Sequence, residues 1–199
     1  MSDMFPSLPD PLDMGALFNA FPNTIRPLLE YHDRLLRDWS PLTVGERELI
    51  AAYVSGLNAC SYCHGAHTFA AQAFGIDEAV FELLMTDIDS APLDSKLRPL
   101  LAYVKKLTLK PASISSLDAE AVYEAGWEEQ ALFDAISVCA LFNFMSRIVE
   151  GSGLHSNPLT ATSENRAAMV KRFSGGAVAD NSHEAPATYS RLMSFWGIT

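Results

Sequence analysis

The stretch TVGERELIAAYVSGLNACSYCHGAHTFAAQAF, residues 43–74, predicts two successive helices joined by a short break. Thr43 and Glu46 fit a capping box, in which the threonine side chain accepts one backbone N–H and the glutamate reaches back to another. A helix is therefore expected to begin here and to run to about residue 57. The next two residues form the break, and a second helix is expected over residues 60–74.

The rest of the chain is also expected to be helical, because apolar residues recur at helical spacing between start and stop signals. Gly75 is placed to end the second helix in a left-handed conformation. The stretch from Trp127 to Glu150 is the longest predicted helix and is strongly apolar. No stretch shows the alternation typical of a strand, and no glycine-rich phosphate loop follows one, so the predicted fold is all-α. Further helices are expected over residues 27–39, 77–85, 96–109 and 116–126.

The 199 residues are enough for a single domain with a large core. Residues 1–22 are rich in Pro, Asp and Met and are expected to form an irregular arm with at most one helical turn. The helical core is expected over about residues 23–153. Residues 154–199 are more polar, include Ser-Gly-Gly and Asp-Asn-Ser segments, and end in the apolar stretch Tyr189 to Trp196. This C-terminal extension is expected to pack on a neighbouring subunit.

The composition, 49% apolar and 19% charged, is typical of a well-packed globular protein, and long apolar helices suggest an oligomer. The net charge of −10 disfavours a nucleic-acid partner, because an acidic chain repels phosphate backbones. The first residues lack a basic segment followed by an apolar run, and every apolar stretch is interrupted before it reaches the length of a membrane span. A cytoplasmic protein is therefore expected. In that reducing compartment, three cysteines argue against a disulfide framework.

Two of the three cysteines are spaced C-x-x-C at the start of the second predicted helix. At about 100° per residue, Cys60, Cys63, His64 and His67 share one face of that helix. The unpaired N–H groups and the positive dipole end of a helix favour an anion, so a thiolate there has a lowered pKa. His67 lies one turn after Cys63 and can accept a proton, directly or through a water.

These groups suit the reduction of a weak O–O bond. The attacked thiolate would become a sulfenic acid, and the partner sulfur would condense with it to a disulfide. Glu48 lies on the preceding helix, where a carboxylate set against His67 would orient the ring and raise its basicity. Small residues on the same face, Ala51, Ala52 and Ser55, would let the two helices approach closely.

The spacing Glu48-x11-Cys60-x-x-Cys63-x3-His67 resembles the core motif of the AhpD-like alkylhydroperoxidase family, in the carboxymuconolactone decarboxylase superfamily. The motif similarity covers about residues 40–75. The flanking residues Leu42-Thr43, Glu46-Arg47 and Asn58-Ala59, and the later Asn143-x-x-x-Arg147, are similar to the branch called peroxidase-related enzymes.

The resemblance implies an AhpD-like helical bundle with the C-x-x-C at the N-terminus of a core helix. It implies a homo-oligomer (dimer, trimer or hexamer) that reduces hydroperoxides with electrons from a lipoyl or thioredoxin-like dithiol donor, without a bound cofactor or metal. Cys63 would attack the peroxide, Cys60 would resolve it, and His67 with Glu48 would relay the proton. Tyr62 stands where better-characterised members carry a further histidine, and it does not titrate near neutral pH. Possible supporting residues are Tyr62, His64, Asn143 and Arg147.

Other interpretations stay open. A C-x-x-C with histidines could bind zinc, and Cys60 to His64 also matches the haem c attachment pattern, which requires export. A decarboxylase-like enzyme without redox chemistry, or a redox-sensing module without turnover, is also compatible with the chain. Simpler roles are expected for the remaining candidates: a buried apolar thiol for Cys139, surface or capping positions for His32, His155 and His183, and core or subunit contacts for Trp127, Phe142 and Phe144.

Overall fold

The computed structural model describes residues 4–154 and 182–198, and in these ranges the chain forms helices and no strand. The all-α prediction is therefore confirmed for the part of the chain that is described. His155 and the Ser-Gly-Gly segment lie outside it. The helices are α1 (Met14–Ala20), α2 (Pro22–Leu36), α3 (Val44–Leu57), α4 (Ser61–Ala73), α5 (Glu78–Leu84), α6 (Leu97–Leu109), the short η1 (Pro111–Ser113), α7 (Ser116–Glu124), α8 (Glu129–Ser152) and α10 (Tyr189–Trp196).

The boundaries of α3 and α4 follow the local signals in the sequence. The Glu46 N–H donates to Thr43 Oγ1 at 3.2 Å and the Thr43 N–H donates to Glu46 Oε2 at 2.7 Å, which completes the predicted capping box. Between the helices, Ala59 adopts a left-handed φ of 57°, a conformation that costs a residue with a Cβ roughly 1 kcal/mol. This tight turn makes Cys60 the N-cap of α4.

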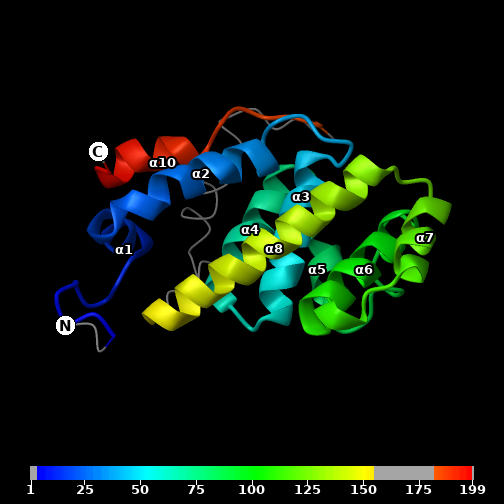
Figure 1. Ribbon diagram of the computed structural model, residues 1–199, viewed down its shortest axis with the longest axis horizontal. Coiled ribbons are helices and arrows are strands. Elements are labelled where there is room, and N and C mark those ends of the chain that lie inside the picture. The colour runs from blue at the N-terminus through cyan, green and yellow to red at the C-terminus, as the bar shows by residue number, and fades with distance from the viewer. Residues whose placement is uncertain (1–3, 155–181, 199) are drawn as a thin grey trace.

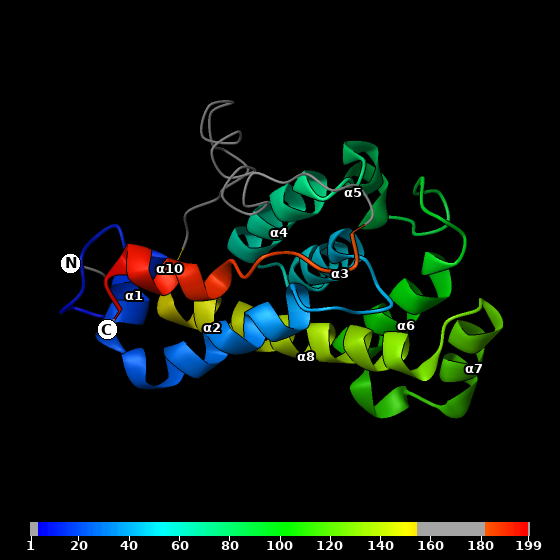
Figure 2. The same cartoon turned by 90° about the horizontal axis from the view of Figure 1, so that it is seen from above.

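Helix α4 packs most extensively against α3, and the long α8 runs through the middle of the molecule against α2, α3, α4 and α6 (Figure 1). The close α3–α4 approach depends on the small residues predicted for it, since Ala51, Ala52 and Ser55 are fully buried. Gly45 leaves no room for a side chain, because a Cβ there would come within 2.7 Å of the Phe74 carbonyl oxygen. Helices α1, α2 and α10 form one end of the molecule, and α6 and α7 form the other (Figure 2).

Three predictions about the chain need correction. Helix α2 begins at Pro22, because this first proline occupies N1, where its missing N–H costs nothing, and the helix continues through Pro27. The expected irregular arm contains the seven-residue α1, which Asp13 caps by accepting the Ala16 N–H. The third correction concerns the prediction that no apolar stretch reaches the length of a membrane span. Helix α8 is long and apolar enough by length and composition, but half of its most apolar window is buried inside the fold, as in a core helix.

The end of the chain lies along α2 and across the start of α3. The Val44 N–H donates to the Ser182 carbonyl and the Ala185 N–H donates to the Arg37 carbonyl, each at 2.8 Å. Helix α10 then runs beside α2, as Figures 1 and 2 show. In the described residues this segment packs on its own chain, and packing of the extension on a neighbouring subunit stays a prediction. Helix α10 thereby reaches the cavity described next.

Candidate active site

A cavity of about 140 Å³ opens between α4, α8 and the α1–α2–α10 end of the molecule. Its wall is mostly apolar. Its titratable side chains are two histidines, one cysteine and two tyrosines. The lining residues are Met14, Phe18, Leu29, His32, Tyr62, Cys63, Ala66, His67, Phe142, Met145, Tyr189, Leu192 and Trp196.

The two cysteines of the motif are free thiols in different surroundings. Cys60 is fully buried, whereas Cys63 is 4% exposed and lines the cavity. The Cys63 S–H and backbone N–H both donate to the Cys60 sulfur, and the pKa of Cys60 is lowered mainly by the S–H, against the effect of burial. The pKa of Cys63 is raised because it gives its hydrogen bond to Cys60 and is itself buried.

Of the two thiols, Cys60 at the N-cap is therefore the one that ionises more readily. The sulfur that a substrate in the cavity can reach is Cys63. Because the two sulfurs are hydrogen-bonded, they titrate as a pair, and transfer of the Cys63 proton to an ionised Cys60 would place the charge on Cys63. Glu150 on α8 opposes both ionisations, because its carboxylate raises the pKa of each thiol.

His67 and Glu48 are in contact, as the sequence predicted. His67 Nδ1 lies 2.5 Å from Glu48 Oε2, and Glu48 is completely buried. Burial alone would raise the pKa of Glu48, but Arg37 and His67 more than offset it, and the pKa falls to about 2. Because the carboxylate is ionised, it fixes a proton on Nδ1 of His67 and leaves Nε2 for the cavity.

Arg37 and Tyr189 complete this buried network, and neither was predicted as a site residue from the sequence. Arg37 Nη1 lies 2.6 Å from Glu48 Oε1, and the Tyr189 hydroxyl donates to the same oxygen at 3.0 Å. The Tyr189 ring also lies 5.1 Å from the Arg37 guanidinium carbon. The network thus joins α2, α3, α4 and α10 around a single carboxylate.

Asp33 on α2 anchors the start of α10. Its Oδ1 accepts the N–H groups of Thr188 and Tyr189 at 2.7 and 2.8 Å, and its Oδ2 accepts that of Ser190 at 2.7 Å. Burial would raise the pKa of Asp33, but these hydrogen bonds lower it. An ionised carboxylate at a helix N-terminus also opposes the positive end of the helix dipole. Asp33 therefore holds Tyr189 against Glu48.

Replacing Tyr189 by phenylalanine is expected to destabilise the protein by about 1 kcal/mol, the usual cost of one buried hydrogen bond. The loss should be no larger, because Arg37 still neutralises Glu48. Urea denaturation would measure it, with Tyr123→Phe as the control, since Tyr123 is 41% exposed. Equal stabilities for the two variants would contradict a contribution from the Tyr189 hydroxyl.

The supporting residues suggested by the sequence divide into two groups. Tyr62 lines the cavity, whereas the His64 ring turns away from it and its Nδ1 donates to the Ala52 carbonyl at 2.9 Å. Asn143 accepts from the Asn58 amide at 3.1 Å and so fixes the end of α3, two residues before Cys60. Arg147 is exposed and bonds back to Asn143, away from the thiols.

The prediction that His32 is a surface or capping residue is wrong. It is 2% exposed and lies in the cavity wall, 5.9 Å between ring centroids from Phe142 and 5.0 Å from Tyr189. His183 is exposed, as expected, and its Nδ1 donates to the Ser40 carbonyl. Cys139 is a buried thiol outside the cavity, and Phe142 is a core residue that also contacts the His67 ring, at 4.2 Å.

In the ranges that the structure describes, no group of three or more His, Cys, Asp or Glu side chains is arranged to hold a metal ion. Cys63 and His67 both line the cavity, and the carboxylate that contacts the His67 ring also pairs with Arg37. This arrangement suits acid–base and thiol chemistry.

Residues 22–106 match the family model of the carboxymuconolactone decarboxylase family. The fold is similar to that of a peroxidase-related protein from Ralstonia eutropha JMP134, an alkylhydroperoxidase AhpD core. The two chains are 24% identical with a TM-score of 0.67, and the match covers 76% of this chain and 77% of that one. The fold is equally similar to that of a peroxidase-related protein from Silicibacter sp. TM1040, with 24% identity, a TM-score of 0.67, and coverage of 83% and 92%. No curated protein matches the sequence significantly.

The family match covers less than half of the chain, and the similarity to the two solved structures shows that this chain shares their helical fold. The matched residues include the C-x-x-C, His67 and Glu48 but end before α8 and α10. Tyr189 therefore lies outside the part of the chain that the family model describes.

Proposed function

We propose that this protein is a thiol-dependent peroxidase that reduces organic hydroperoxides through a cycle between the Cys60/Cys63 dithiol and its disulfide. The observation that carries the proposal is the position of Cys63. It is the motif sulfur that lines an apolar cavity, beside a histidine bound to a buried carboxylate. An apolar wall favours an alkyl or aryl hydroperoxide over hydrogen peroxide.

The proposed cycle begins with one shared proton on the thiol pair and one on His67. As the Cys63 proton moves to Cys60, the Cys63 sulfur attacks the terminal oxygen of the hydroperoxide. The S–O bond forms, the O–O bond breaks, and the departing alkoxide takes the proton of His67 and leaves as the alcohol. Cys63 is then a sulfenic acid. Cys60 attacks its sulfur, the S–S bond forms, and the hydroxide leaves with the Cys60 proton as water.

An external dithiol closes the cycle, because each turn takes two electrons from the cysteine pair that must be replaced. A lipoyl or thioredoxin-like donor would attack the disulfide, become oxidised itself, and return both cysteines to the reduced state. One proton then passes back from the pair to His67. We propose that this takes place in the cytoplasm, where such donors are reduced.

The test is hydroperoxide consumption by the purified protein with dihydrolipoamide as the reductant. The wild type is expected to consume one equivalent of cumene hydroperoxide per dithiol oxidised, and to use hydrogen peroxide less efficiently. The double variant C60S/C63S is expected to show only the uncatalysed rate. Turnover that survives in the double variant would point instead to chemistry of the decarboxylase type.

The raised pKa of Cys63 favours a second candidate, a redox sensor in which the disulfide forms without efficient turnover. A mostly protonated attacking thiol reacts slowly, because the thiolate is the nucleophile. This alternative is supported if the disulfide forms stoichiometrically with peroxide and changes the assembly state, while the dithiol reductant is not consumed catalytically.

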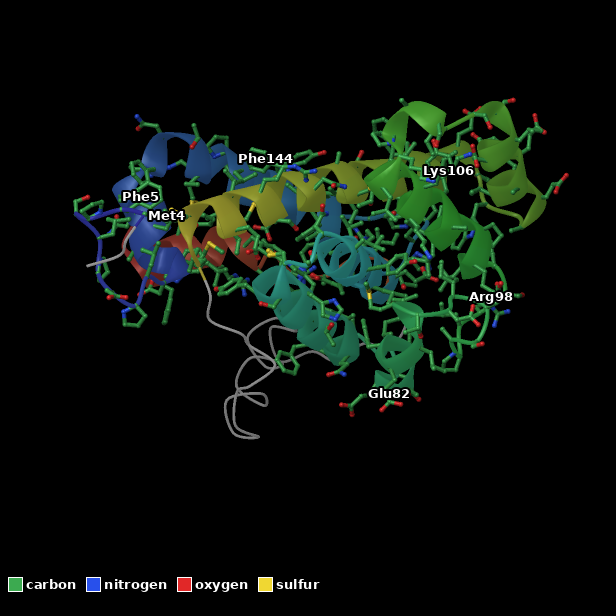
Figure 3. All side chains as sticks on the ribbon, turned by 90° about the horizontal axis from the view of Figure 1, so that it is seen from below. Met4, Phe5, Glu82, Arg98, Lys106 and Phe144 are labelled. Atoms are coloured by element: carbon green, nitrogen blue, oxygen red, sulfur yellow. The ribbon has the colours of Figure 1, made fainter. Side chains whose placement is uncertain are left out.

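We also propose that the chain forms a homo-oligomer through the outer face of α8. Phe133 and Phe144 project from this helix with 64% and 49% of their surfaces exposed, and Figure 3 shows Phe144 on the edge of α8 turned away from α4. Large aromatic side chains exposed along one helix are typical of contact surfaces.

A further inference from the structure

His32 is a buried histidine in the cavity wall that the proposed cycle does not yet use. It comes from α2, outside the C-x-x-C helix, and lies on the same cavity as Cys63 and His67. The rings of both histidines contact Phe142, with centroids 5.9 Å and 4.2 Å away. Two imidazoles thus line one small cavity, and their environments differ.

The two rings differ in what holds Nδ1. His67 Nδ1 faces the ionised carboxylate of Glu48 at 2.5 Å, an acceptor that carries a charge. His32 Nδ1 lies 2.7 Å from the Leu28 carbonyl oxygen, an acceptor without charge. Since a carbonyl only accepts, the proton of His32 is on Nδ1.

The remaining nitrogen of His32 is therefore an acceptor. Burial is the largest influence and lowers the pKa of His32 to about 4; the hydrogen bond to the Leu28 carbonyl restores only part of this loss, and His67 lowers the pKa further, so the ring is neutral at physiological pH. Within residues 4–154 and 182–198, no hydrogen bond to Nε2 of His32 is formed. A neutral imidazole with its Nδ1 occupied offers one lone pair, on Nε2.

A hydroperoxide in this cavity needs such an acceptor. Its terminal oxygen carries one O–H, and that oxygen is the atom that Cys63 attacks. In the proposed cycle His67 holds a proton for the departing alkoxide, so it acts as a donor at that moment. The Tyr189 hydroxyl donates to Glu48. Of the two imidazoles in the wall, His32 is therefore the one that can accept.

We infer that His32 binds the hydroperoxide by accepting the hydrogen bond of its O–H at Nε2, and thereby aims the terminal oxygen at Cys63. The O–H bond itself is not broken, because this hydrogen stays on the oxygen that becomes the sulfenic acid. The inference rests on the proposed peroxidase function and assigns the two histidines opposite roles: His67 donates and His32 accepts.

The test compares His32→Leu and His32→Gln in the full-length protein. His32→Leu removes the acceptor, and its second-order rate constant for cumene hydroperoxide is expected to fall about tenfold or more, the effect of one lost hydrogen bond in a closed site. His32→Gln keeps an acceptor oxygen and should recover part of the rate. In both variants, alkylation of Cys63 by methyl iodide should proceed at the wild-type rate, because methyl iodide has no O–H or N–H to be held.

Each result decides a different point. If His32→Leu slows peroxide reduction and alkylation equally, His32 only shapes the cavity and the inference is overturned. A wild-type peroxide rate in His32→Leu overturns it as well and leaves the peroxidase function intact. A wild-type protein that does not reduce the hydroperoxide overturns the proposed function and with it the role of His32. Far-ultraviolet circular dichroism confirms that each variant is folded.

Discussion

Replacing Cys63 by serine is expected to reduce hydroperoxide consumption to the uncatalysed rate, a loss of more than about a hundredfold, because a serine hydroxyl is a far weaker nucleophile than a thiol at neutral pH. Cys63 is the motif sulfur that lines the cavity, and no other side chain there can replace it. Fold and stability should change little, since serine is nearly the same size. Peroxide consumption with a dithiol reductant measures the effect.

Cys139→Ser is the matched control, because Cys139 is also a buried free thiol but lies outside the cavity, where it contacts Thr108 Oγ1 at 3.3 Å. That variant should keep the wild-type rate. Equal activity of the Cys63→Ser protein and the wild type would show that Cys63 is not the attacking sulfur.

Cys60→Ser should separate the two halves of the cycle. Without the resolving sulfur, Cys63 should stop at the sulfenic acid, which dimedone traps as an adduct detectable by mass. The pKa of Cys63 should also fall in this variant, because the Cys60 sulfur, which raises it in the wild type, is gone. A dimedone adduct on Cys60 in the Cys63→Ser protein would instead assign the attack to the buried sulfur.

The local part of the fold could be predicted because its signals are close together in the sequence. The capping box at Thr43 and Glu46 fixes the start of α3, and Gly75, at a φ of 92°, ends the α4 segment as expected. Helical spacing alone places Cys60, Cys63 and His67 on one face. The contact between His67 and Glu48 needed only two adjacent helices and the small residues between them.

The rest of the site depends on contacts that no local pattern encodes. Tyr189 contacts Glu48 across a sequence separation of 141 residues, and Asp33 holds it there by capping the start of α10. Arg37 follows the last residue of α2 and has no counterpart in the motif. The apolar stretch in the C-terminal extension was the one available signal, and it indicated a packing surface without indicating which one.

His32 could have been recognised. Leu29, His32 and Leu36 follow one another at intervals of three and four residues, so they share a helix face, and all three are buried. The prediction failed because histidine is a polar residue that is usually found at intermediate exposure. A buried polar residue within an apolar stripe is itself an indication of a site.

Replacing Glu48 by glutamine is expected to have the largest effect on stability, about 3–5 kcal/mol, because it leaves the fully buried Arg37 without its counter-charge. His67 also loses the anion that orients its ring, so the rate of peroxide reduction should fall about a hundredfold. Thermal unfolding and the peroxide assay measure the two effects. Glu82→Gln is the control, since Glu82 is exposed on α5 (Figure 3) and should change neither.

The pH dependence distinguishes a lost charge from a local packing defect. The pKa of Glu48 is about 2 in the folded protein against an ordinary value of 4.5, so the group stabilises the fold fully above pH 4.5. That contribution, about 3 kcal/mol, is lost as the pH falls from 4.5 towards 2, because the unfolded chain then binds the proton first. Wild type and Glu48→Gln should therefore differ strongly in their free energy of unfolding at pH 7 and progressively less below pH 4.5. A difference that stays constant from pH 7 to pH 3 would mean that Glu48 acts through its shape, and that the buried charge does not hold the site together.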